Sequence, residues 1–343
     1  MPSTPASAKP ELSGIAVCWG GASGLEELIA AWPADPRFEL VVVDNGPAGE
    51  VNARLAAVKA GAPAGVRVLE PGVNLGFAGG INAGLAAAQA PAVLLLNPDA
   101  VPEPGALEAL LDGLAAHPEA AGLAPRLVGP DGRPQHRWQL RRLPGVATLL
   151  AQAAFLPAGA GPREEPAEGA AVEQPAAAAL LLRRAAIEAA GGLDQGFFPA
   201  WFEDVDLARR LAAAGATLRY WPRALFRHRL GSSVPRLGYG RFLWIYDRNL
   251  VRYLGKHHGR GAALLARALL PAAALTRLAL LPLRRPRRAA SRREAARGLL
   301  AVALGGLTGW RRPRAWACAY EGDLNGARRA PEPAERRAAE NGG

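Results

Sequence analysis

Cysteine is scarce in this chain of 343 residues, which contains only Cys18 and Cys318. Two cysteines so far apart in the sequence do not suggest a disulfide framework, and they lack the paired spacing of a zinc site. The N-terminal stretch also lacks an apolar segment of the signal-peptide type, and its proline and serine residues predict a disordered leader over residues 1–13. Together these absences predict a cytoplasmic protein.

Lysine is scarce as well, so arginine carries nearly all of the positive charge. The chain has 41 basic and 30 acidic residues, a net charge of +11. Residues 260–343 hold 17 arginines and 6 acidic residues, so the whole excess lies there and the first 259 residues are neutral. The partner that this charge attracts should therefore meet the C-terminal end. We expect no nucleic acid, because the arginines lack interleaved aromatic residues.

Four short apolar runs without polar alternation predict strands that are buried on both faces, as in a parallel sheet. These runs cover residues 14–19, 38–44, 66–70 and 92–97. Segments of helical length, rich in alanine and leucine, lie between them at residues 24–32, 50–60 and 80–89. Strands that alternate with helices predict an α/β fold with a doubly wound, mostly parallel sheet.

Polar residues follow three of the predicted strands, at the carboxyl ends where such sheets bind ligands. Asp44 ends the second strand, a glycine-rich loop over residues 74–82 follows the third, and Asn97-Pro98-Asp99 follows the fourth. Each stretch alone could also be a structural turn or a helix start. The glycine-rich loop lacks the spacing of a dinucleotide site and the lysine of a P-loop, which disfavours NAD and ATP.

The stretch FPAWFEDVDLARRL, residues 198–211, places three carboxylates behind two aromatic residues. One interpretation is structural: Glu203, Asp204 and Asp206 begin a helix, Asp206 pairs with Arg210, and one or both aromatic residues are core. The other is functional, because a carboxylate at a helix start can project into a cleft and take a proton from a substrate hydroxyl. The two interpretations are compatible.

The order of five motifs is more specific than any one of them. VVVDNG, NLGFAGGINAGL, LLLNPDA, GGLDQGFFPAWFEDVDLARRL and RHRLGSS follow one another with ordinary spacing. In this order the chain resembles the family 2 glycosyltransferases with a GT-A fold, over about residues 12–255. Within that family it looks most like the rhamnosyltransferase-type group that builds bacterial cell-surface polysaccharides.

The resemblance implies a role for each matching residue. Asp204 would be the catalytic base, with Glu203 beside it near the acceptor. Asp99 would end a DXD-type motif that holds Mg²⁺ or Mn²⁺ on the diphosphate, and His228 would complete this metal site, although a histidine between two arginines could also simply be exposed. The residues that would bind the nucleotide sugar are Asp44, Asn74, Gly79, Gly80, Asn82 and Asn97.

The C-terminal part adds a second expectation. Residues 261–283 are apolar enough to suggest a membrane span, but Arg267 and Arg277 interrupt them, Pro271 would kink them, and an arginine cluster follows. This pattern favours an element on the anionic inner face of the cell membrane. The alternative is a helical pair packed on the main domain with an exposed arginine face. The expected units are a GT-A domain, a basic helical extension and a disordered tail, at residues 14–255, 256–325 and 326–343.

We therefore expect an inverting glycosyltransferase that moves a sugar, with rhamnose as the best guess, from a nucleotide-diphosphate donor. The acceptor would be a saccharide carried on polyprenyl diphosphate, in the synthesis of cell wall or surface polysaccharide. The alternative is a catalytically degenerate GT-A module that only binds nucleotide sugars. Two departures from the family support it: the first loop reads AVCWGGASG, and Asn97 stands where the DXD motif has its first acid.

Overall fold

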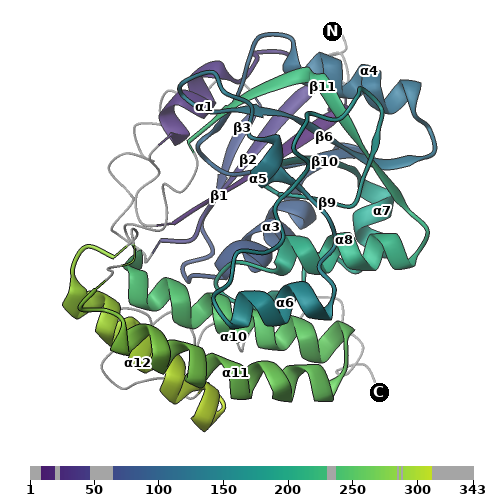
Figure 1. Ribbon diagram of the computed structural model, residues 1–343. Helices are drawn as coiled ribbons and strands as arrows, with labels where there is room; N and C mark the ends of the chain where they lie inside the picture. Colours follow the sequence, from purple (N-terminus) through teal and green to yellow (C-terminus); the bar gives the residue numbers. More distant parts are fainter. Residues whose placement is uncertain are drawn as a thin grey trace, which may run out of the picture.

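The computed structural model describes residues 9–19, 24–46, 65–229, 237–283, 286 and 289–310 (Figure 1). The predicted helix over residues 50–60 and the predicted tail lie outside the described residues, as do Cys318 and most of the predicted leader.

Nine strands of the described residues form one central sheet. Their bounds are β1 (Leu12–Cys18), β2 (Phe38–Asp44), β3 (Val66–Leu69), β4 (Ala92–Leu96), β5 (Ala100–Pro102), β6 (Ala120–Val128), β8 (Ala171–Val172), β10 (Ala179–Arg183) and β11 (Thr217–His228). The order is β3-β2-β1-β4-β10-β6-β11-β5, and β8 pairs with β11. The pairs β1–β2, β1–β4, β2–β3 and β6–β11 are parallel. The predicted α/β sheet is confirmed, and β10 makes it mixed by running antiparallel between β4 and β6.

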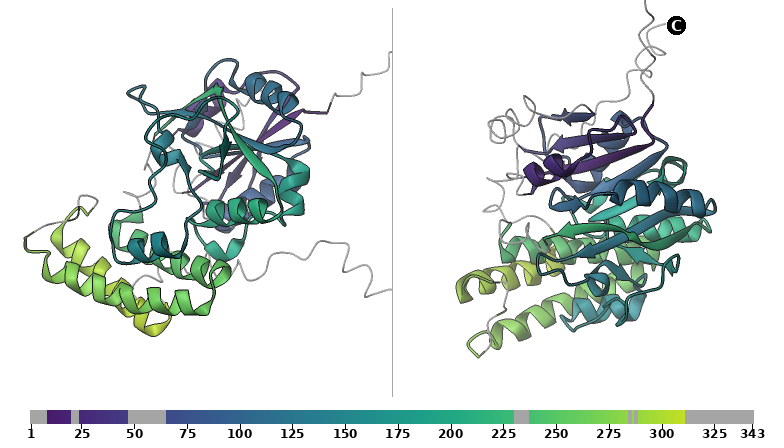
Figure 2. Two further views of the ribbon diagram at one scale, coloured as in Figure 1. Left: turned by 45° about the vertical axis from the view of Figure 1, so that its right-hand side comes forward. Right: turned by 90° about the horizontal axis from the view of Figure 1, so that it is seen from above.

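Helices cover both faces of this sheet (Figures 1 and 2). On one face pack α1 (Leu25–Ala31) and α4 (Ala106–Ala116). On the other pack α3 (Gly76–Ala87), α7 (Arg184–Ala189) and α8 (Glu203–Ala213). The remaining short elements are α5 (His136–Gln139), η1 (Gln195–Phe197) and a separate two-stranded sheet of β7 (Leu140–Arg141) and β9 (Gln174–Pro175).

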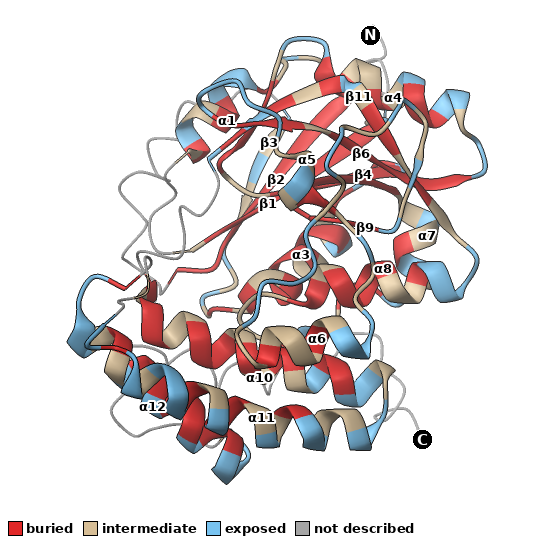
Figure 3. Ribbon diagram, in the orientation of Figure 1, coloured by how far each residue is buried: buried red, intermediate tan, exposed pale blue. Residues whose placement is uncertain are grey.

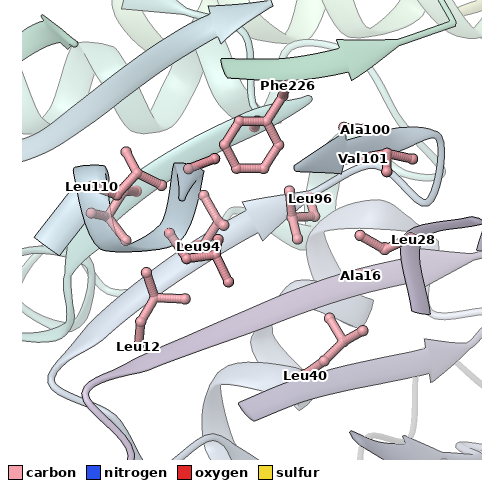
Figure 4. Close-up of a cluster of buried hydrophobic side chains, with 14 of the residues drawn as sticks. Leu12, Ala16, Leu28, Leu40, Leu94, Leu96, Ala100, Val101, Leu110 and Phe226 are labelled. Carbon is pink, nitrogen blue, oxygen red and sulfur yellow. The ribbon is translucent and has the colours of Figure 1, made fainter. Parts of the chain in front are cut away.

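Alternate residues of each central strand face opposite sides of the sheet. In β4, Leu94 and Leu96 join the cluster under α1 and α4 (Figure 4), whereas Val93 and Leu95 join the cluster under α3 and α8. Because helices bury both faces, neither set can be polar. This double burial is the physical reason that the strands appear as uninterrupted apolar runs in the sequence.

A separate helical layer lies beyond α3 and α8 (Figures 1 and 2). It consists of α6 (Val146–Ala153), α10 (Tyr239–His257), α11 (Arg260–Ala279) and α12 (Arg292–Thr308), which share a third apolar cluster. α11 continues through Pro271, which packs against Gly306 of α12, where an added Cβ would lie 2.7 Å from Pro271 Cγ. The predicted domain boundary after residue 255 falls inside α10, and the division of the chain into domains stays a prediction.

Candidate active site

The carboxyl ends of β1, β2 and β4 lie side by side, because these strands are parallel neighbours. Asp44 ends β2, and Asp99 follows β4. Cys18 lies at the end of β1, close to both carboxylates. Burial raises the pKa of its thiol, and the negative charges of Asp44 and then Asp99 raise this pKa further. Two acidic residues that are far apart in the sequence are thus brought to one edge of the sheet, as predicted.

Asn45 joins this edge to the glycine-rich loop. Its Nδ2 donates a hydrogen bond to the carbonyl oxygen of Gly76 at 2.8 Å, and its Oδ1 accepts one from the amide of Leu75 at 3.3 Å. Asp44 beside it accepts a hydrogen bond from the amide of Gly46 at 2.8 Å. Asn45 lies in the motif VVVDNG, but its role could not be predicted, since its partners lie about thirty residues further along the chain.

Asn74 combines burial with an unused donor. Its side chain is 1% exposed, and its Oδ1 accepts a hydrogen bond from the amide of Gly76 at 2.8 Å. Its Nδ2 has no hydrogen-bond partner among the described residues. Because a buried donor without a partner is costly, this amide nitrogen is well suited to an oxygen of a bound ligand.

The predicted pocket residues within α3 also have structural roles. A Cβ on Gly80 would lie 2.7 Å from Val17 Cγ1, and one on Gly79 would lie 2.8 Å from Leu75 Cβ. The side chain of Asn82 accepts from the amide of Leu193 at 2.9 Å and donates to its carbonyl oxygen at 2.8 Å. The glycines therefore permit close packing, and Asn82 fastens α3 to the segment before α8. Their predicted contacts with a nucleotide sugar stay predictions.

Asp99 and His228 form a buried pair at the same edge. β5 pairs with the end of β11, and this register brings the histidine next to the residues that follow β4. His228 is 2% exposed and Asp99 is 4% exposed, so the alternative of an exposed histidine is wrong. His228 Nε2 lies 3.6 Å from Asp99 Oδ1 and 3.4 Å from Asn97 Nδ2.

Gln135, just before α5, fixes the state of this histidine. Its Nε2 donates to the carbonyl oxygen of His228 at 2.9 Å, so its Oε1, 2.8 Å from His228 Nδ1, must accept a hydrogen from that nitrogen. Burial lowers the pKa of His228, although Asp99 acts in the opposite direction. The ring is thus neutral and presents the lone pair of Nε2 to Asp99. Trp138 stacks on the ring, with centroids 5.3 Å apart.

These side chains suit a hard divalent cation that keeps part of its coordination for other oxygens. They offer a carboxylate, a neutral imidazole nitrogen whose tautomer is set, and the amide of Asn97. Within the part of the chain that the structure describes, no three or more His, Cys, Asp and Glu side chains gather into a metal-binding group. Asp99 and His228 would therefore share a metal with the oxygens of a ligand, as a diphosphate complex requires. The metal roles of Asp99 and His228 stay predictions.

The three carboxylates at the start of α8 have different surroundings. Asp206 is fully buried and meets Arg210 at 2.8 Å, Lys256 at 2.6 Å and His257 at 2.7 Å, which confirms its predicted pairing and gives it a structural role. Burial, reinforced by the charges of Asp204 and then Asp206, holds the pKa of Glu203 well above its usual range. Asp204 is half-buried and accepts from the next amide at 2.8 Å.

Glu203→Gln is expected to make the stability of the protein less sensitive to pH. The raised pKa means that folded Glu203 binds a proton that the unfolded chain releases, so wild-type stability falls as the pH rises from about 4.5 towards the folded pKa. Glutamine keeps the shape without this loss, and the variant should gain about 1.4 kcal/mol over wild type for each unit of the raised pKa. Urea denaturation of both proteins at acidic and neutral pH measures their free energies of unfolding. An equal change of this free energy with pH in the two proteins would contradict the prediction.

Two unusual backbone conformations precede α8. Trp201 and Phe202 have φ values of 71° and 74°, a region that side chains other than glycine rarely occupy. Asn249 of α10 is fully buried, and its Nδ2 donates to the carbonyl oxygens of Ala200 at 2.9 Å and Trp201 at 3.1 Å. We call residues 198–202 the catalytic loop because the predicted base follows them. α10 thus holds this loop in the conformation that presents Glu203 and Asp204. Phe202 is core, as expected for at least one of the two aromatic residues.

Asn249→Ala is expected to lower kcat by about 10-fold to 10²-fold, because a carboxylate displaced by about 1 Å loses much of its effect. The KM for the donor should change little, since the predicted donor contacts lie on other loops. Asn249→Gln, which keeps the amide donor, should recover part of kcat. Steady-state kinetics measure this split, and a variant that only melts at a lower temperature while keeping kcat would show that Asn249 serves stability alone.

Comparison with known proteins places this arrangement in a family. Residues 22–186 match the model of glycosyl transferase family 2. Among curated proteins, N-acetylglucosaminyl-diphospho-decaprenol L-rhamnosyltransferase of Mycobacterium tuberculosis, from strains CDC 1551 / Oshkosh and ATCC 25618 / H37Rv, is 29% identical over 191 residues. That match covers 50% of this chain and 61% of each relative.

Two solved structures share the fold. The mannosyltransferase PcManGT from Pyrobaculum calidifontis, in complex with GDP-Man and Mn²⁺, matches with a TM-score of 0.50 and 17% identity, over 94% of this chain and 87% of its own. GalNAc-T7 with UDP, GalNAc and Mn²⁺ matches with a TM-score of 0.53 and 14% identity, over 73% of this chain and 48% of its own.

The central sheet, the helices on its two faces and the likeness to these two structures define a GT-A fold. More narrowly, residues 22–186 match the model of glycosyl transferase family 2, and the chain is similar to an L-rhamnosyltransferase. The predicted family, fold class and enzyme class are thereby confirmed. The matched segment ends before α8 and the end of β11, so the roles of Asp204 and His228 still depend on their motifs and on the geometry described above.

Proposed function

We propose that this chain is an inverting glycosyltransferase that moves a sugar, with rhamnose as the best guess, from a nucleotide diphosphate to a saccharide acceptor. The buried Asp99–His228 pair, with its tautomer set by Gln135, is the observation that carries the proposal. This pair offers one carboxylate and one neutral imidazole at the edge of the sheet where the motifs of the predicted donor site lie. Rhamnose and a polyprenyl-diphosphate-linked acceptor are supported by the names of the mycobacterial relatives.

In the proposed reaction each residue acts on a defined atom. Asp204 takes the proton from the acceptor hydroxyl, whose oxygen then attacks the anomeric carbon from the side opposite the diphosphate, so the configuration inverts. Asn74 donates its free amide hydrogen to an oxygen of the donor. Asp99 and His228 would hold a divalent cation, which would supply positive charge for the departing diphosphate, and Asn97 would contact the nucleotide sugar. Glu203, whose pKa is raised by burial and by the charge of Asp204, lies beside this base and would contact the acceptor.

Calorimetric titration with UDP, dTDP and GDP, each with and without Mn²⁺, tests the proposal directly. Binding of one nucleotide that depends on Mn²⁺ would support it and identify the donor. A folded protein that binds none of the three would contradict it.

Binding of a nucleotide sugar without any turnover would instead favour the degenerate GT-A module. One observation favours that candidate: Asn97 directs its amide nitrogen, not a carboxylate, towards His228. One acidic ligand fewer weakens a divalent metal site.

Gln135→Ala is expected to weaken Mn²⁺-dependent nucleotide binding by about 10-fold to 10²-fold, the usual effect of removing the partner of a metal-ligating histidine. Without Gln135 the ring of His228 can rotate and change its tautomer. Gln89→Ala is a matched control, because this glutamine is exposed in the segment between α3 and β4. Titration with nucleotide and Mn²⁺ measures the effect, and equal affinities for both variants would remove Gln135 from the site.

We further propose that the protein works in the cytoplasm at the inner face of the cell membrane. A polyprenyl-linked acceptor is fixed in the bilayer, and nucleotide sugars are soluble, so the enzyme must meet both at this surface. The decaprenol-linked substrate in the names of the mycobacterial relatives supports this location.

A further inference from the structure

The exposed side of α11 is mostly apolar after its first turn. Leu264, Ala268, Ala272, Leu275 and Ala279 are all exposed, and their spacing of three or four residues places them on one side of the helix. The helix contains three arginines. Arg260, its first residue, is exposed and lies four residues before Leu264, at the start of this side. Arg267 donates to the carbonyl oxygen of Gly306 at 3.3 Å, and Arg277 donates to that of Phe155 at 2.6 Å. From Leu264 to Ala279 the side therefore carries no charge.

α12 continues this surface and adds charge to one end of it. Arg293, Arg297, Leu300, Leu304 and Leu307 are all exposed and recur at intervals of three or four residues. The first two turns of this face are thus basic and the later turns are apolar. Leu307 is 71% exposed and Leu304 is 57% exposed, which is unusual for leucines on a helix that is otherwise packed into a core.

These side chains are concentrated on two helices that share the third apolar cluster. Ten large apolar side chains of the described residues are exposed, and eight of them lie between residues 264 and 307. Figure 3 shows the exposed parts of α11 and α12 on the outside of the helical layer, away from the central sheet. We call this patch the leucine face; its residues are Leu264, Leu265, Leu275, Leu300, Leu304 and Leu307. An exposed apolar patch of this kind marks a surface that meets a partner.

The packing of α11 decides how it could meet a membrane. It is the one described helix that is long and apolar enough to cross a bilayer. Its inner side, however, includes Ala266, Leu270 and Ala274, all fully buried in the third apolar cluster with α10 and α12. The helix is therefore fixed to the domain along its length, and its orientation suits lying on a membrane surface.

We propose that the leucine face rests on an anionic lipid leaflet, with its leucines in the boundary between headgroups and acyl chains. Arg293 and Arg297 would meet the lipid phosphates. The proposal rests on the proposed function, because a lipid-linked acceptor requires contact with a membrane. The charge of the face identifies lipid as the occupant: apolar side chains beside exposed arginines match the apolar interior and anionic surface of a bilayer.

Flotation of the full-length chain with lipid vesicles tests this proposal. We expect binding to vesicles that contain phosphatidylglycerol, much weaker binding to vesicles of phosphatidylcholine alone, and loss of binding at high salt. The double variant Leu264→Gln with Leu304→Gln should weaken binding at least about tenfold. Arg297→Glu should also weaken it about tenfold, because the reversal removes one attraction and adds one repulsion.

Arg133→Glu is the matched control, since this exposed arginine lies in a turn before α5, distant in sequence from the leucine face. It makes the same charge change and should leave binding as it is. No flotation with anionic vesicles, or equal loss for Arg133→Glu and Arg297→Glu, would overturn the proposal. So would a dimer in sedimentation velocity that the leucine variant dissociates, because the face would then belong to a second copy of the chain.

Nucleotide titration of the same preparations separates this proposal from the proposed function. A protein that binds nucleotide with Mn²⁺ but ignores vesicles overturns the membrane assignment alone. A protein that binds anionic vesicles through the leucine face but binds no nucleotide overturns glycosyl transfer alone. Retained nucleotide binding by the leucine variant also shows that the substitutions leave the catalytic domain folded.

Discussion

Asp204→Asn is expected to lower kcat by about 10²-fold to 10⁴-fold, the range that a positioned general base contributes. Asparagine has nearly the same shape but cannot take the proton of the acceptor hydroxyl. Donor binding should stay nearly unchanged, because the predicted donor residues lie after β2, β3 and β4. Transfer to a synthetic acceptor, together with calorimetry of the donor nucleotide, measures the two effects separately.

Two further variants make this test specific. Asp112→Asn changes an exposed aspartate of α4 and should leave kcat unchanged. Asp206→Asn weakens a buried cluster with Arg210, Lys256 and His257, so it should lower the melting temperature more than it affects the chemical step. Normal turnover by Asp204→Asn would remove that residue as the base.

The second large effect is expected for Asp99→Ala. Removal of the one carboxylate of the predicted metal pair should weaken Mn²⁺-dependent nucleotide binding by more than about 10²-fold, beyond the effect of losing a supporting partner. Binding measured without metal should change much less. Nucleotide titrations at several Mn²⁺ concentrations measure this loss of affinity. The Mn²⁺ concentration at which nucleotide binding increases should change, and not only the affinity at saturating Mn²⁺.

His228→Ala should show the same shift in metal dependence, because the two side chains lie 3.6 Å apart and would share one cation. Its effect and that of Asp99→Ala should not add in the double variant. Unchanged Mn²⁺ dependence in both single variants would place the metal elsewhere.

The central strands could be predicted because their sequence obeys one local rule. Burial on both faces leaves no place for polar residues, and the four apolar runs became β1 to β4 with small shifts at their ends. The antiparallel direction of β10 could not be predicted in this way. Its run of leucines is as apolar as that of β4, and the direction in which it pairs depends on the path of the chain before it.

The site residues that lie in recognisable motifs could be predicted from the sequence. The residues whose roles depend on distant contacts were missed. Asn45, Gln135 and Asn249 act on residues 30 to 93 positions away, and no local spacing announces such partners. Each was an ordinary polar residue in the sequence. The one available signal was that Asn45 lies directly beside Asp44.

The C-terminal pattern left two interpretations open, a membrane element or a helical pair packed on the domain. The described helices show the packed pair: exposed arginines lie at the start of α11 and of α12, and the rest of the exposed side of α11 is mainly leucine and alanine. Composition could not separate these two interpretations. A helix that packs on a domain with one side and faces lipid with the other has the same average hydropathy as a membrane element or a packed helix.

α10 links the two ends of the proposed activity. Its residue Asn249 holds the catalytic loop, while Leu250, Tyr253 and Leu254, all fully buried, belong to the cluster shared with α11 and α12. With the leucine face on lipid, this rigid helix keeps Asp204 at a constant height above the bilayer. The enzyme would then choose among lipid-linked saccharides by how far their free ends extend from the membrane, as well as by the identity of their last sugar.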